Sequence, residues 1–149
     1  MVVRCPKEIL PEMTGILLIS HGPLAHSLVE SSRLIAGDAP NVASLSLEDG
    51  DDANAFRELL VETYRKFPKG ALILVDMKGG TPLNQLLFAM QQEAMDLLAL
   101  CGANLSMVVE AIFARNVAEG TELLRQVEEA GREAVVNVTE MVKSLRSRG

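Results

Sequence analysis

Two polar residues that can form a nucleophilic pair each follow an apolar run. His21 comes directly after ILLIS (16–20), and Asp76 comes directly after ALILV (71–75). A carboxylate that accepts a hydrogen bond from one imidazole nitrogen fixes the tautomer and leaves the lone pair of the other nitrogen free to attack. If the two runs are neighbouring parallel strands, their carboxyl ends bring His21 and Asp76 together as candidate catalytic residues.

The segment after Asp76 has the composition of an anion-binding helix start. It reads MKGGTPLN over 77–84. The two glycines permit backbone conformations that other residues avoid, Thr81 is a favourable N-cap, and Pro82 fits the first helical position. Free N–H groups at a helix start bind anions, which beside a nucleophilic histidine suits a phosphoryl group. The candidate phosphoryl-binding residues are Gly79, Gly80 and Thr81 in this segment, together with Gly22, which directly follows His21.

Each of these features also has a purely structural interpretation. A lone histidine such as His21 is often a partly buried structural residue, Asp76 can simply cap the amides of a turn, and GGTP can be a plain connection from strand to helix. His26 is expected on the solvent side of a helix. No third ligand at suitable spacing completes a zinc site with the two histidines, and we expect neither a metal nor a cofactor.

The elements that must position these residues alternate between short apolar runs and helical spacing. Strands are expected at 15–20, 41–47, 71–76 and 96–102, and helices at 24–35, 56–67, 83–90, from 107, and from 116 to about 131. This alternation predicts an α/β fold with a doubly wound, mostly parallel sheet of four to five strands, order 2-1-3-4, and helices on both faces. That order makes the strands before His21 and Asp76 neighbours.

The ends of the chain and of one helix carry weaker signals. Residues 1–13 are interpreted as an N-terminal lead-in and 14–149 as a single domain. Asn116 and Glu119 form a pair like a capping box for the last helix of the domain. The tail suits a helix by the spacing of its valines and leucines, whereas VVNV (135–138) alone suits a strand, and both alternatives stay open.

The composition excludes several classes of protein. The chain has 149 residues, of which 48% are hydrophobic and 23% charged, as in a soluble globular domain. A net charge of −6 and 3% aromatic residues argue against nucleic acid as a partner. The patterns GxxxxGK(S/T), GxGxxG and GxSxG are absent. A phosphoryl reaction here therefore does not draw on ATP through a P-loop.

Taken together, these motifs resemble the mannose/fructose/sorbose-type IIA component of the bacterial phosphoenolpyruvate-dependent sugar phosphotransferase system. That family has His-Gly after its first strand and D-x-x-G-G-(S/T)-P-x-N after its third, matched here by 21–22 and 76–84. NVASLSLEDGDD (41–52) resembles its second strand and acidic loop. GANLSMVVEAIFAR (102–115) resembles its G-x-N-x-P-M…E…R segment. The likeness runs from about residue 15 into the 130s.

The resemblance implies a phosphotransferase with a phosphohistidine intermediate that serves sugar uptake. His21 would accept a phosphoryl group from the carrier protein HPr and pass it to a separate IIB component, Asp76 would hold the imidazole, and Thr81 would lie beside the phosphoryl oxygens. Membrane IIC and IID components are implied as indirect partners, and they set the sugar. The resemblance also implies a cytoplasmic homodimer with an exchanged C-terminal strand, for which 135–138 is the candidate.

The chain departs from the family pattern at two positions, and two related functions remain as alternatives. Lys78 replaces an apolar or aromatic residue, and Ser106 replaces a proline. The phosphoryl-donor subunit of dihydroxyacetone kinase shares the strand-end histidine, but GGTPLN argues against it. A flavodoxin-like binding or receiver module would use Asp76 as the phosphorylated group. It needs an acidic cluster after the first strand, where this chain has SHG.

Overall fold

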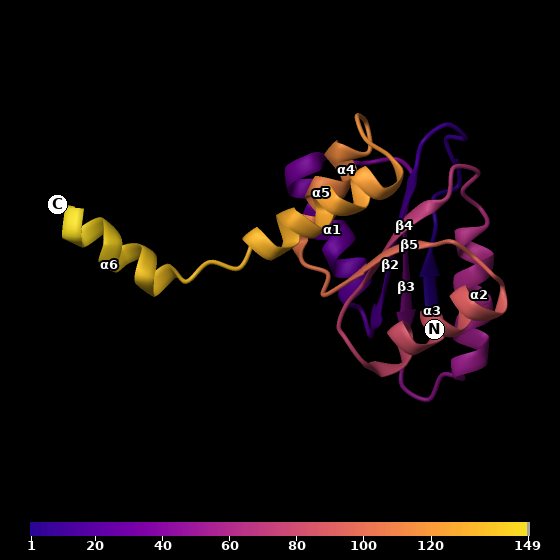
Figure 1. The fold of residues 1–149 in the computed structure, drawn as a ribbon. Helices are drawn as coiled ribbons and strands as arrows, with labels where there is room; N and C mark the ends of the chain where they lie inside the picture. Colours follow the sequence, from indigo (N-terminus) through magenta and orange to yellow (C-terminus); the bar gives the residue numbers. More distant parts are fainter. Residues whose placement is uncertain (149) are drawn as a thin grey trace.

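A five-stranded sheet forms the centre of the molecule, which we describe from a computed structural model over residues 1–148 (Figure 1). The strands are β1 (Val2–Arg4), β2 (Gly15–His21), β3 (Val42–Leu47), β4 (Ala71–Val75) and β5 (Leu98–Cys101). The helices are α1 (Leu24–Ala36), α2 (Ala53–Tyr64), α3 (Gly80–Gln92), α4 (Leu105–Ala114), α5 (Gly120–Glu133) and α6 (Val138–Arg148).

The strand order is β1-β3-β2-β4-β5. The four strands from β2 to β5 pair in parallel with one another and follow the predicted 2-1-3-4 order. The edge strand β1 was not predicted, and it pairs antiparallel with β3. Because β2 lies between β3 and β4, the residues that follow β2 and β4 emerge side by side at one edge of the sheet.

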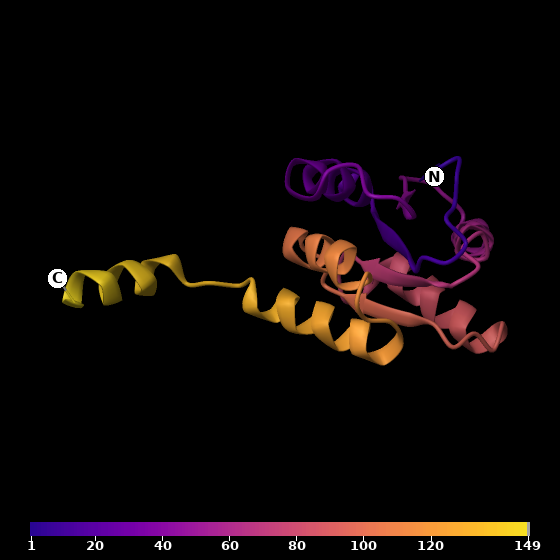
Figure 2. The ribbon, with the colours of Figure 1, turned by 90° about the horizontal axis from the view of Figure 1, so that it is seen from above.

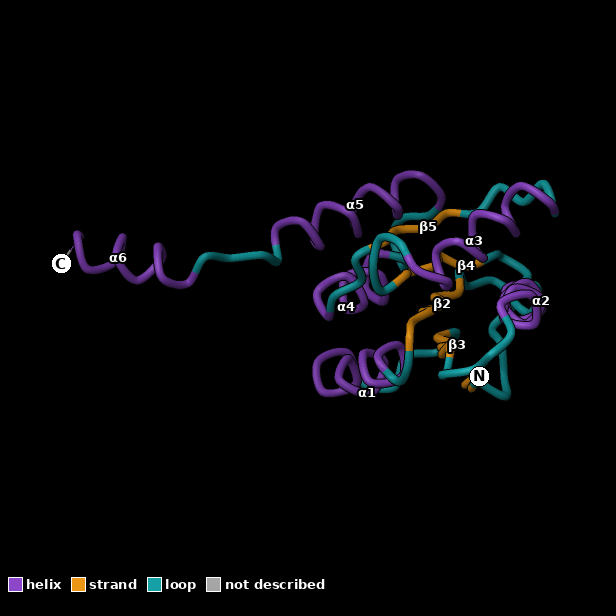
Figure 3. Tube along the Cα trace, turned by 90° about the horizontal axis from the view of Figure 1, so that it is seen from below, coloured by secondary structure: helices purple, strands orange, loops and turns teal. Residues whose placement is uncertain are grey.

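Helices cover both faces of the sheet (Figure 3). One core packs β2 and β4 against α1, α4 and α5, and includes Ile16, Leu72 and Val108. The other packs the opposite sides of the same strands against α2 and α3, and includes Phe56 and Leu86. Every residue of β4 is buried, which explains its continuous apolar sequence and gives the residue after it a rigid base.

The motif at 102–115 is structural in this fold. The Asn104 side chain caps α4 by accepting from the Met107 N–H at 3.0 Å, and it also donates to the Gly131 carbonyl at 3.2 Å. Ser106 is exposed in the first turn of α4, where a proline is equally tolerated. The predicted capping pair of Asn116 and Glu119 is wrong: α5 begins at Gly120 and no side chain caps it.

Arg115 fastens the end of α4 to two loops. Its residue is 8% exposed, and its guanidinium donates to the carbonyls of Thr14 at 3.1 Å and Pro40 at 2.6 Å. Burial lowers the pKa of Arg115 to about 10, so the group is still a cation at neutral pH. These bonds hold the loops that lead into β2 and β3.

We expect Arg115→Met to lower the free energy of unfolding by about 2–4 kcal/mol, because buried carbonyls lose their donor. Urea unfolding followed by circular dichroism measures this loss. Arg125→Met is the matched control, because Arg125 forms only exposed pairs with Glu122 and Glu129, each worth about 0–1 kcal/mol. A loss for Arg115→Met no larger than that of the control would contradict the assignment.

The C-terminal helix α6 projects away from the sheet and its helices (Figures 1 and 2). Residues 134–137 link it to α5, and none of its residues is buried. Of the two alternatives for the tail, the single chain has the helix. Within residues 1–148 no helix is long and apolar enough to cross a bilayer.

Candidate functional site

His21 and Asp76 lie together at the carboxyl edge of the sheet, as predicted. His21 is the last residue of β2, Asp76 directly follows β4, and β2 and β4 are paired in register up to Ile19 and Val75. The His21 Nδ1 and the Asp76 Oδ2 are 2.8 Å apart. The same oxygen accepts from the backbone N–H of His21 at 2.9 Å. One carboxylate oxygen thus holds both the ring and the main chain of the histidine.

The second oxygen of Asp76 is also fixed. Its Oδ1 accepts from the Met77 N–H at 2.9 Å. An ionised carboxylate can only accept hydrogen bonds, so the proton between Asp76 and the ring resides on Nδ1. The other ring nitrogen, Nε2, then carries a free lone pair and is the nucleophilic atom of the pair.

The two side chains differ sharply in exposure. The His21 side chain is 44% exposed and that of Asp76 only 7%. The imidazole is therefore open to another macromolecule, while the carboxylate that orients it is shielded from water. This combination suits group transfer between two proteins, because the reacting atom is accessible and its orientation does not depend on the partner.

Gly80, at the start of α3, lies against the reactive side of the imidazole. A Cβ built on Gly80 would be 2.7 Å from the His21 Nε2 and 2.6 Å from its Cε1. Gly79 and Gly80 have φ values of 85° and 82°, which other residues rarely adopt. Because two successive glycines turn the chain here, the backbone of the first turn of α3 comes close to Nε2.

The predicted cap of α3 is wrong in detail. The helix begins at Gly80, its N-cap position is Gly79, and no side chain caps it. Thr81, expected as the N-cap, is half-buried in the first turn. The left-handed glycines allow the helix to start earlier than a threonine cap would. The first N–H groups of a helix have no partner within it, so the uncapped start remains suited to an anion.

We expect Gly80→Ala to slow any group transfer through the His21 Nε2 by about 10- to 100-fold, because the added methyl group must displace the ring and a misplacement of about 1 Å costs that much. The matched control is Gly50→Ala. Gly50 has the same φ of 82°, but nothing lies within 4 Å of its added Cβ. Both variants carry similar backbone strain, so stopped-flow transfer rates separate strain from displacement of the ring. Equal rates in the two variants would contradict the role of Gly80.

Ser20 organises the loop after β2 and was not singled out from the sequence. Its Oγ accepts from the Ala25 N–H at 2.8 Å and donates to the Gly22 carbonyl at 3.0 Å. The Gly22 N–H in turn donates to the Leu47 carbonyl at 2.8 Å. A serine at the buried end of an apolar strand, next to a histidine, was the signal for this role. Ser20 ties the start of α1 to the chain beside His21.

The remaining candidates lie around this pair. Gly79 and Lys78 are exposed in the turn between Asp76 and α3. His26 does not belong to the site, and its predicted solvent-side position is wrong, because its residue is only 5% exposed against β3. Within residues 1–148 no group of three or more histidine, cysteine or acidic side chains is arranged to hold a metal ion.

The chain is similar to known proteins over most of its length. Residues 15–128 match the family described as "PTS system fructose IIA component". The "PTS system mannose-specific EIIAB component" of Escherichia coli strain K12 is 31% identical over an alignment of 129 residues that covers 81% of this chain. The matched region is 38% of that relative, so the chain spans well under half its length.

Two further relatives match over most of their own length. The "PTS system fructose-specific EIIA component" of Bacillus subtilis strain 168 is 25% identical, covering 91% of this chain and 93% of the relative. The crystal structure of a phosphotransferase system component EIIA from Streptococcus agalactiae superposes with a TM-score of 0.78 at 29% identity. It covers 86% of this chain and 99% of the other. The two proteins share this α/β fold.

Proposed function

Because the chain belongs to the family of PTS fructose IIA components, we propose that it is a phosphoryl carrier of a sugar phosphotransferase system. His21 takes the phosphoryl group from phospho-HPr and passes it to a IIB component on a separate chain. The observation that carries this proposal is the exposed imidazole whose Nδ1 is held 2.8 Å from a shielded carboxylate.

In the forward step, the lone pair on the His21 Nε2 attacks phosphorus. A new P–N bond forms as the bond between phosphorus and the donor breaks, and that electron pair stays with the donor. Asp76 accepts from Nδ1–H and stabilises the positive charge that develops on the ring. The amides at the start of α3, with Gly79, Gly80 and Thr81, receive the phosphoryl oxygens. Gly22 leaves the opposite side of the loop open.

The second step repeats the first with the roles reversed. The His21 Nε2 becomes the leaving group when a nucleophile of the IIB component attacks the same phosphorus. Little covalent machinery is needed, since positioning and charge balance suffice for such a transfer. Both partners are proteins of the cytoplasm, where we place this chain, and the membrane IIC and IID components act downstream of it.

The direct test is transfer of label from phosphoenolpyruvate. With enzyme I and HPr present, we expect the chain to acquire one phosphoryl group, labile to acid and stable to base as phosphohistidine is. We expect a IIB component to discharge it. Omitting HPr is the control. Uptake without HPr, or a base-labile label as expected of an aspartyl phosphate, would overturn the proposal.

We also propose that the chain is a homodimer in which α6 packs on the second copy. An isolated helix of 11 residues is marginal in water, and α6 exposes Val138, Met141 and Leu145 at 63%, 47% and 61%. Burying this apolar face on a partner stabilises both the helix and the dimer.

Analytical ultracentrifugation tests the dimer. We expect the full chain to sediment as a dimer and Met141→Ser/Leu145→Ser to shift it toward monomer, while Lys143→Ser, on the same helix, has no effect. Lys143 pairs only with exposed Glu140, so its loss removes no apolar contact. A monomeric full chain, or a double variant that stays dimeric, would contradict the packing of α6.

A further inference from the structure

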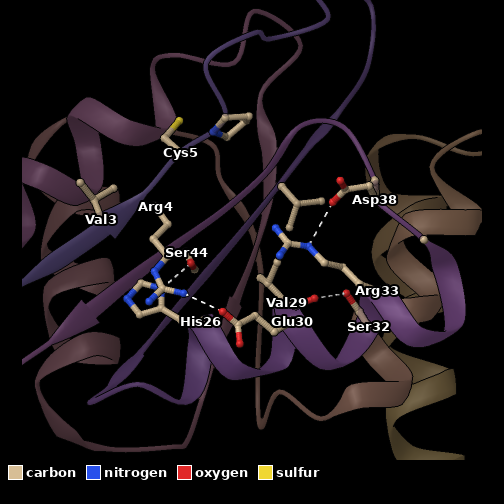
Figure 4. Close-up of a pocket in the computed structure, with 14 residues that line it drawn as sticks. Val3, Arg4, Cys5, His26, Val29, Glu30, Ser32, Arg33, Asp38 and Ser44 are labelled. Atoms are coloured by element: carbon tan, nitrogen blue, oxygen red, sulfur yellow. Dashed lines mark hydrogen bonds and ion pairs between the residues drawn. The ribbon is translucent and has the colours of Figure 1, made fainter.

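A pocket lies away from His21, between α1, the edge strand β1 and β3 (Figure 4). Its volume is about 560 Å³, within the range of sites that hold small molecules. The sheet contributes Val42 and Ser44, α1 contributes a row of side chains that includes Arg33, and the loop after α1 closes one end.

One wall of this pocket comes from outside the family region. Val3, Arg4, Cys5 and Pro6 line it, whereas the family match begins at residue 15. The strand β1 that carries this wall was not expected from the sequence. The pocket is therefore a property of this chain and its N-terminal segment, and it is separate from the phosphoryl-transfer site.

Two ion pairs stand at the pocket. The Arg4 Nη1 is 3.0 Å from the Glu30 Oε1, and the Arg33 Nε is 3.1 Å from the Asp38 Oδ1. All four side chains are more than half exposed. Exposed pairs of this kind contribute about 0–1 kcal/mol, so a ligand can replace either partner at small cost. Together they present two positive and two negative groups with no net charge.

A buried histidine forms part of the wall. The His26 Nδ1 is 2.5 Å from the Ser44 Oγ, while its Nε2 is buried and has no hydrogen-bond partner in the described part of the chain. Burial, followed by the nearby Arg4 charge, lowers the pKa of His26, whereas Glu48, Glu30 and the Val2 backbone act in the opposite direction. The ring is thus neutral at neutral pH. An unpaired buried nitrogen is uncommon, and it offers one more polar contact if Arg4 moves aside.

We propose that this pocket binds a small zwitterion of the amino-acid type with an aliphatic side chain. The carboxylate replaces a protein acid on Arg4 or Arg33, where a guanidinium fork binds it in bidentate fashion. The ammonium group pairs with the acid that this exchange frees, Glu30 or Asp38. A ligand with only a negative charge would leave the displaced Glu30 or Asp38 without a partner. A ligand with only a positive charge would leave an arginine without one.

The apolar part of the lining supports the aliphatic side chain. Val29, Ala39 and Val42 line the pocket and are partly buried against the core beneath it. An aliphatic group placed there covers apolar surface that is now open to water, which favours binding at about 25 cal/mol per Å² of surface removed.

The test uses the full chain and three probes that share the same branched aliphatic group. L-leucine is titrated in two-dimensional ¹H–¹⁵N NMR spectra beside 4-methylpentanoate, which lacks the ammonium group, and 3-methylbutylamine, which lacks the carboxylate. We expect saturable shifts for L-leucine at the amides of α1 and 37–42. We expect binding at least about tenfold weaker for each singly charged analogue, because a hydrogen-bonded charge is lost.

Variants locate the binding. We expect the double variant Arg4→Met/Arg33→Met, which removes both guanidinium groups that could bind the carboxylate, to weaken L-leucine binding about tenfold or more. Arg65→Met, which breaks the exposed Arg65–Glu93 pair outside this pocket, should leave it unchanged. Equal binding of an analogue, shifts elsewhere in the chain, an unchanged affinity in Arg4→Met/Arg33→Met, or no saturable binding of L-leucine would each overturn the proposal.

Discussion

We expect the His21→Ala chain to take up no phosphoryl group from phospho-HPr, a loss of at least about a thousandfold, since the nucleophile of a covalent step is removed. No other imidazole can replace it. The sequence has two histidines, and the second, His26, is 5% exposed with its Nε2 buried. Transfer of ³²P from phosphoenolpyruvate through enzyme I and HPr, read on a gel at neutral pH, measures this loss.

Two controls keep the His21 result interpretable. Circular dichroism should give the same spectrum for His21→Ala as for the unchanged chain, because the His21 side chain is exposed and supports no core packing. His26→Gln, which keeps a hydrogen-bonding group opposite Ser44, should still take up label. Label on His21→Ala would contradict the assignment of the nucleophile.

The second large effect is expected for Asp76→Asn, with transfer about 10- to 1,000-fold slower and the fold retained. In the unchanged chain one carboxylate oxygen accepts from both the Nδ1 and the backbone N–H of His21, and the other accepts from the Met77 N–H. Asparagine has one acceptor oxygen and no charge. It leaves one of these donors unpaired and no longer stabilises the developing cation on the ring.

Rapid-quench measurement of the transfer rate tests Asp76. Asp38→Asn is the matched control, because this substitution removes the same charge from a side chain that is 90% exposed. Asp38 follows the C-terminal end of α1, whereas His21 precedes its N-terminal end. We expect the control to transfer at the rate of the unchanged chain. If Asp76→Asn also keeps that rate, Asp76 is only the cap of the turn at Met77, which was the structural alternative for this residue.

The proximity of His21 and Asp76 could be predicted from the sequence because it depends on two strong sequence patterns. The runs before His21 and Asp76 are continuously apolar, as strands buried on both faces must be, and short alternating elements limit the topology to a few parallel orders. Once the two strands are neighbours, their ends meet. The hydrogen bond between His21 and Asp76 then follows from the fold without further information.

Other features depend on contacts that no local pattern records. The strand β1 has only three residues and forms because β3 offers it an edge. His26 is buried because β1 and β3 enclose the start of α1, although its position on the helix looked solvent-facing. The cap of α3 was misplaced because Thr81 has a strong preference for such a position, while two left-handed glycines begin the helix earlier.

The position of the phosphoryl group on the chain tests the central claim most directly. The chain is phosphorylated from phosphoenolpyruvate through enzyme I and HPr, with ¹⁵N-labelled histidine incorporated, and examined by long-range ¹H–¹⁵N and ³¹P NMR at mildly alkaline pH. We expect a single phosphohistidine, on the Nε2 of His21, with Nδ1 still protonated toward Asp76. A phosphoryl group on Nδ1, on His26 or on a carboxylate would contradict it.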